Sequence, residues 1–240
     1  FAAPIAVCSV DPEVVRPITG AADFLGDESY DPAELELSYN WKMVDQPIGS
    51  TVSMPTGDAN RYDFVPDLAG EYVAELTVTN SEGVSSEPCE AVLTAEPAEA
   101  LWVELYWEND GDDMDLHLLA PGGGLETDLD CYFANCAPSF FSSGLDWGVI
   151  GDTTDDPSLD LDDIPNAGPE NINIEEPQEG IFTVVVHDYP GSVFRGGNPV
   201  TVNIYLDGAL QWTDTRVISD EDTYTSFAEI DTSAGTITPL

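Results

Sequence analysis

Short runs of alternating apolar and polar residues, separated by Pro, Gly, Asn and Asp, most limit what this chain can fold into. Residues 70–80, for example, place apolar side chains on one face and Glu and Thr on the other. Alternation with a period of two predicts a half-buried β-strand, and helical periodicity is almost absent. The predicted strands are 5–10, 22–25, 37–43, 62–65, 70–80 and 90–95 in the first half, and 101–107, 114–119, 181–188, 200–206, 210–215 and 223–230 in the second.

The segment 94–100 (TAEPAEA) separates these strands into two groups. We therefore predict an all-β fold of two antiparallel β-sandwich domains in tandem, immunoglobulin-like or jelly-roll-like, at residues 1–96 and 97–240. Asp207 and Gly208 lie between two predicted strands, which favours a two-residue hairpin turn. Residues 121–178 have little strand character and many acids, and loops of that length are usually functional.

The charge balance is extreme, with 47 Asp and Glu against five Lys and Arg and a net charge of −42. Nucleic-acid affinity comes largely from Lys and Arg, and anionic lipid headgroups would repel such a surface. These are therefore excluded as partners, and no apolar run reaches the roughly 18 residues of a membrane span. High salt or bound divalent cations would screen the repulsion between the acids.

The four cysteines are even in number and form no C-x-x-C motif, which favours disulfides over zinc or redox chemistry. Three connectivities are possible. We favour Cys8–Cys89, between the first and last strands of the first domain, and Cys131–Cys136, which closes a short loop. Free buried thiols are the alternative. Disulfides would place the chain in the extracellular space or at the cell surface.

Residues 4–95 contain a series of motifs: SYDP at 29–32, LSYNW at 37–41, FVPD at 64–67, GEY at 70–72 and LTVT at 76–79. In this order they resemble a PKD-type domain, an immunoglobulin-like sandwich of extracellular proteins. The resemblance implies a spacer or adhesion module rather than an enzyme. In such a sandwich we expect Trp41 between the sheets and Tyr72 at a strand corner.

Residues 110–118 (DGDDMDLHL) form an acidic predicted strand. Alternation places its apolar residues on one face and Asp113, Asp115 and His117 on the other. Neighbouring carboxylates repel each other unless a cation lies between them or water solvates them, and hard oxygen ligands at this density favour calcium. His117 either joins such a site or hydrogen-bonds a carboxylate. His187, after an apolar run, is expected to be structural.

A second acidic segment, DTTDDPSLDLDD at 152–163, is followed by GPENIN at 168–173. A loop with this many carboxylates is not expected to become ordered without a counter-ion. Its spacing differs from the EF-hand pattern, so any calcium site is irregular. The alternative is a salt-adapted surface whose acids are solvated.

The second half also resembles a domain of secreted and surface proteins of myxobacteria and their relatives, over about residues 101–210. The resemblance is carried by DMDLHL at 113–118, DCYFAN at 130–135, DPSLDLDD at 156–163 and GPENI at 168–172. It implies an extracellular, calcium-supported β-sandwich, often found beside PKD-like repeats. With the acidic patterns, it gives as predicted calcium ligands Asp113, Asp115, Asp130, Asp156, Asp160, Asp162, Asp163, Glu170 and Asn171.

The usual catalytic motifs are missing from the sequence, including G-x-S-x-G, H-E-x-x-H and a phosphate-binding glycine loop. We predict a non-catalytic, calcium-stabilised structural or adhesive protein that self-associates into a surface fibre or coat, or binds other surface proteins. The alternative is an accessory module that binds glycans or a protein. Trp102, Trp147 and Trp212 are then the candidate platforms for sugar rings.

Overall fold

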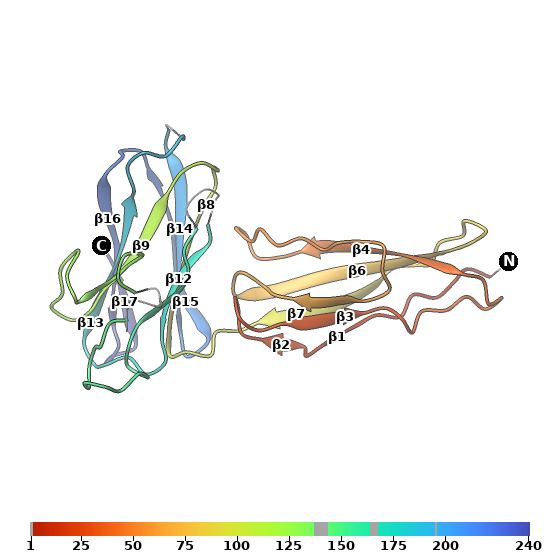
Figure 1. Ribbon diagram of the computed structural model, residues 1–240, viewed down its shortest axis with the longest axis horizontal. Helices are drawn as coiled ribbons and strands as arrows, with labels where there is room; N and C mark the ends of the chain where they lie inside the picture. The colour runs from red at the N-terminus through yellow and green to blue at the C-terminus, as the bar shows by residue number, and fades with distance from the viewer. Residues whose placement is uncertain (1, 137–143, 164–167, 195) are drawn as a thin grey trace. The chain divides into compact units, whose positions relative to one another are not determined.

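The computed structural model describes residues 2–136, 144–163, 168–194 and 196–240. These residues form seventeen β-strands in four sheets and no helix, so the all-β prediction is confirmed (Figure 1). The chain divides into two compact units, residues 1–96 (unit 1) and 97–240 (unit 2). Over the residues described, no helix is long and apolar enough to cross a membrane.

Unit 1 is a sandwich of a three-stranded and a four-stranded sheet. The first sheet has the order β1 (Ser9–Asp11), β3 (Ala22–Leu25) and β5 (Arg61–Phe64). The second has the order β2 (Val14–Val15), β7 (Cys89–Ala95), β6 (Gly70–Asn80) and β4 (Leu37–Asp45). The pair β2–β7 is parallel and the other pairs in both sheets are antiparallel.

Aromatic side chains fill the core of unit 1. Trp41 is buried with its ring 5.9 Å from that of Phe24, and its indole N–H donates to the Ala59 carbonyl at 3.0 Å. The hydroxyl of Tyr72 is buried within 3.0 Å of both the N–H and the carbonyl of Leu68. The expected positions of Trp41 and Tyr72 are therefore confirmed.

Unit 2 is a sandwich of two five-stranded antiparallel sheets. The β9 sheet has the order β10 (Asp130–Cys131), β9 (Met114–Leu119), β13 (Ile181–Asp188), β16 (Thr223–Asp231) and β17 (Thr236–Pro239). The β12 sheet has the order β11 (Ser158–Leu161), β12 (Glu170–Ile174), β8 (Leu101–Trp107), β14 (Asn198–Leu206) and β15 (Ala209–Ile218).

The core of unit 2 lies between these sheets and includes Met114, Leu116 and Leu118, as the alternation of β9 predicts. The hairpin between β14 and β15 has the predicted two-residue turn. Asp207 and Gly208 both have positive φ, 51° and 76°, as a type I′ turn requires.

Both favoured disulfides are present, Cys8–Cys89 and Cys131–Cys136. The first connects the residue before β1 to the first residue of β7, and these strands belong to different sheets of unit 1. Both cysteines of the second disulfide are buried in the core of unit 2.

The strand prediction omits β2 and β17, and it is wrong in two further places. Instead of a strand over 5–10, an isolated bridge joins Ile5 to Tyr30 and β1 begins at Ser9. The segment 121–178, where we predicted little strand character, contains β10, β11 and β12. Strand β12 (ENINI) has a polar composition with low β-propensity, and its pairing with β8 over five residues overrides that propensity.

Candidate metal centre

Three carboxylates from three segments of unit 2 meet in space. They belong to Asp115 on β9, Asp162 just after β11, and Glu170 at the start of β12. One oxygen of each lies within 4.8 Å of the others. Two oxygens bound to one calcium ion lie at most about 5 Å apart, twice the Ca–O distance. The spacing of this carboxylate cluster therefore fits a single divalent cation.

Glu170 is the most buried member of the carboxylate cluster, at 1% exposure. Its Oε2 accepts a hydrogen bond from the Leu116 N–H at 2.8 Å. Its Oε1 is also buried and has no hydrogen-bond partner among the described residues. Burial raises the pKa of Glu170 well above its usual value, and the nearby charge of Asp115 raises it further.

Asp115 is 3% exposed, and its Oδ2 has no hydrogen-bond partner in the described parts of the chain. The Nδ1 of His187 lies 3.7 Å from that oxygen. Burial raises the pKa of Asp115 to about 8, and the charges of Asp113 and Asp162 contribute. Asp115 and Glu170 are therefore not solvated acids of the protein surface.

The rim of the cluster carries additional negative charge. Asp113 is half-buried, and burial followed by the charge of Asp162 raises its pKa to about 6. Asp112 and Asp163 add smaller repulsions to the same group. Asp162 itself is exposed, so it forms the solvent side of the site.

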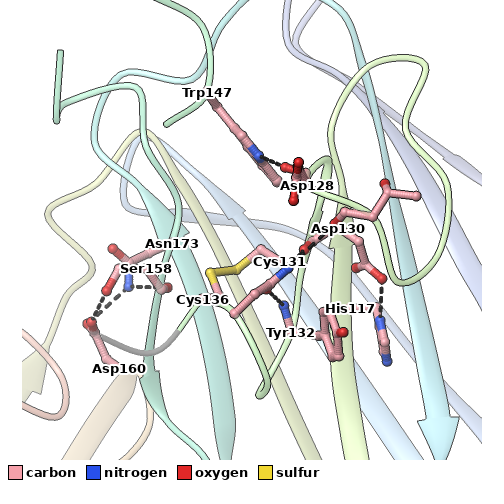
Figure 2. The surroundings of a disulfide bond; sticks show 12 residues. His117, Asp128, Asp130, Cys131, Tyr132, Cys136, Trp147, Ser158, Asp160 and Asn173 are labelled. Atoms are coloured by element: carbon pink, nitrogen blue, oxygen red, sulfur yellow. Dashed lines mark hydrogen bonds and ion pairs between the residues drawn. A yellow bond between two sulfur atoms is a disulfide. The ribbon is translucent and has the colours of Figure 1, made fainter. Parts of the chain in front are cut away.

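Four predicted ligands lie elsewhere in unit 2. Figure 2 shows Asp130 and Asp160 on opposite sides of the Cys131–Cys136 disulfide. Asp130 is 2.8 Å from the Nδ1 of His117, and Asp160 accepts hydrogen bonds from Ser158 and Asn173. These carboxylates form hydrogen bonds elsewhere in unit 2 rather than joining the cluster, and Asp160 connects β11 to β12.

Asp156 and Asn171 are also separate from the cluster. Asp156 accepts a hydrogen bond from the Trp147 N–H at 2.6 Å. Asn171 directly follows Glu170, so strand alternation places it on the opposite face of β12. It pairs in register with Glu104, and neither its amide nitrogen nor its amide oxygen has a hydrogen-bond partner among the described residues.

No protein-family model, curated protein or solved structure matches this chain.

The two histidines of the chain pack against each other on the outer face of the β9 sheet. Their ring centroids are 6.0 Å apart. His117 stacks on Tyr132, and His187 stacks on Tyr224 with centroids 4.0 Å apart. Burial lowers the pKa of His187, although a hydrogen bond with Asp222 opposes that shift. Both rings therefore take part in an aromatic cluster beside the carboxylates.

Sequence reasoning did not single out Glu104, a buried acid on β8. It is 1% exposed and accepts a hydrogen bond from the indole N–H of Trp102 at 3.0 Å. The alternation of residues 101–107 places Trp102 and Glu104 on the same face, but a period of two does not reveal that this outer face is covered. The spacing of Trp102 and Glu104, two residues apart on one face, was the one sequence feature that could have indicated their hydrogen bond.

Proposed function

We propose that this chain is a non-catalytic structural or adhesive module of the extracellular space or cell surface, and that calcium stabilises it. The observation that carries the proposal is the buried Glu170, whose Oε1 lacks a hydrogen bond and whose carboxylate lies close to two further carboxylates. A buried charge without a partner costs several kcal/mol. A cation bound by Glu170, Asp115 and Asp162 would remove most of that cost.

Calcium fits these ligands better than zinc or magnesium. The cluster offers carboxylate oxygens and neither a thiolate nor an imidazole, and hard cations prefer such ligands. Calcium also accepts irregular geometry, whereas magnesium requires a near-ideal octahedron and retains water. Ligands from three separate segments favour the more adaptable ion.

The extracellular part of the proposal is supported by the two disulfides, because such bonds persist in oxidising compartments. The net charge of −42 adds support, because it favours a habitat rich in cations. A spacer role of unit 1 follows from its resemblance to PKD-type domains.

Self-association would use the free edge of β15. This ten-residue strand pairs with β14 only, within the described chain, and Val217 on it is 66% exposed. Exposed edges of this length readily accept another strand. We propose a second copy of the chain as the partner.

The glycan-binding alternative loses two of its three candidate platforms. Trp102 is fully buried, and Trp147 is 3% exposed with its indole N–H bonded to the Asp128 carbonyl (Figure 2). A ring that stacks on a sugar must be accessible. Trp212 is partly buried and packs against the core of unit 2.

Thermal unfolding tests the calcium proposal. At a calcium concentration of about 100 times its dissociation constant, binding stabilises the folded state by roughly 2.7 kcal/mol. Unit 2 has roughly 140 residues, so its unfolding entropy is about 0.3 kcal/mol/K and its melting temperature should rise by about 9 °C. The comparison is excess chelator against millimolar calcium, with sodium matched at low and high concentration.

Asp162→Asn should abolish this shift, because it removes one ligand charge at an exposed position. Asp207→Asn is the matched control: it makes the same charge change and keeps a residue that tolerates positive φ in the turn. If sodium alone reproduces the calcium shift, or if Asp162→Asn responds like the wild type, the metal proposal is wrong.

A further inference from the structure

One edge of β9 is left open by the sheet to which it belongs. Along one side, β9 pairs with β13 over all six residues from Met114 to Leu119. Along the other side it pairs with β10 at Leu118 and Leu119 only. The first four residues of that second edge therefore have no strand partner in the described chain.

A side chain from the opposite sheet occupies this open edge. The N–H of Leu116 donates to Oε2 of Glu170, which belongs to the β12 sheet. A buried backbone N–H must find an acceptor, and here a carboxylate replaces the missing strand. Glu170 thus connects the two sheets through a single hydrogen bond.

In the metal-free protein this connection is electrostatically opposed once the carboxyls around it are ionised. The other oxygen of Glu170 has no hydrogen bond, and the Glu170 carboxylate lies in the cluster with Asp115 and Asp162. Asp115 belongs to the same strand as Leu116, so when both carboxyls are ionised their repulsion acts to push Glu170 away from the edge that it covers. Asp162, in contrast, approaches from the exposed segment after β11.

We propose that the bound calcium ion is a clasp between the two sheets, which holds Glu170 over the open edge of β9 and draws Asp162 against it. The proposal rests on the proposed calcium site and adds what binding does there. In the presence of calcium the edge is closed at Leu116. In its absence Glu170 leaves the edge intermittently, and Leu116 exposes its N–H while the rest of the sandwich remains folded.

Amide hydrogen exchange on the full chain, with and without calcium, tests the clasp. Exchange should slow by about tenfold or more at Leu116 and across residues 158–163 when calcium is added. Amides of β6, which belongs to unit 1, should change little. Calorimetric titration with calcium on the same samples reports binding independently.

Two variants isolate the mechanism. Glu170→Gln keeps an acceptor for the Leu116 N–H but removes the charge, so Leu116 should be protected without calcium and should not respond to it. Glu175→Gln, at an exposed position, is the matched control and should behave like the wild type. Asp162→Asn changes an exposed residue, so the fold is retained, and calcium should no longer slow exchange at Leu116.

The outcomes separate the two proposals. If calorimetry shows calcium binding but exchange at Leu116 is unchanged, or slows equally throughout unit 2, the clasp is wrong and calcium stabilisation remains. If no calcium binding is detected, the proposed calcium site is wrong and the clasp fails with it.

Discussion

Removal of the Cys8–Cys89 disulfide should destabilise unit 1 by an amount set mainly by the length of chain that it closes. The two cysteines are 81 residues apart in sequence. Loop-closure entropy for a loop of this length corresponds to about 4.5 kcal/mol at 25 °C. Since small domains are stable by only about 5–15 kcal/mol, the double variant Cys8→Ala/Cys89→Ala should lose between roughly a third and nine-tenths of the stability of unit 1.

Differential scanning calorimetry measures this effect. Unit 1 comprises residues 1–96, which gives an unfolding entropy of about 0.2 kcal/mol/K and a decrease in its melting temperature of roughly 20 °C. Both cysteines of this pair are only partly buried, so truncation to alanine adds little loss of packing. The transition of unit 2 should stay in place.

The Cys131–Cys136 pair is an internal comparison, because it closes a loop with a separation of only five residues. The same entropy relation gives about 2 kcal/mol, in the transition of unit 2. These cysteines are buried in the core, so alanine variants add a packing loss to that figure. A loss in unit 1 below about 2 kcal/mol would refute the chain-entropy reasoning.

Two further predictions concern Tyr72 and the edge of β15. Tyr72→Phe should cost about 1–2 kcal/mol in unit 1, because it removes the hydrogen bonds to the backbone of Leu68. Burial, with the charge of Asp67, raises the pKa of Tyr72 above its usual value, so folded unit 1 binds more protons than the unfolded chain above about pH 10. Stability of unit 1 should therefore fall as pH rises above 10, and urea titrations should show less of this fall in Tyr72→Phe; an equal fall in both proteins would contradict the assignment. Val217→Lys should reduce self-association measured by sedimentation velocity in calcium, since a charge on an edge strand opposes strand addition, and wild-type protein that stays monomeric at high concentration would exclude assembly through β15.

The sequence by itself determined the fold class and much of the strand set. Residues 70–80 alternate cleanly, and the structure has a strand over the same residues. Asp207-Gly208 predicted its hairpin turn because only a few residue types accept positive φ at both positions. Local backbone preferences, and burial of one face of a strand, are set by a few neighbouring residues. The strand and the turn could therefore be predicted from the sequence.

The strands within residues 121–178 could not be predicted from the sequence. In β12, two isoleucines face the core between asparagines, and the sequence alone suggested a loop of oxygen ligands. Its partner β8 lies more than sixty positions away in register, and a local window contains no information about that pairing. The backbone hydrogen bonds supplied by β8 decide that the segment is a strand.

The candidate metal centre divides in the same way. The sequence indicated that Asp113, Asp115, Asp162, Asp163 and Glu170 were unusual, because acids cluster around them. It did not distinguish them from Asp130, Asp156 and Asp160, which lie in equally acidic segments but form hydrogen bonds outside the carboxylate cluster. Only the packing of β9 against β12 brings Asp115 and Glu170 together and removes them from water. The clustering of acids can be read from the composition of a segment. The loss of water around a carboxylate depends on which other segments cover it, and only the tertiary structure decides which segments do so.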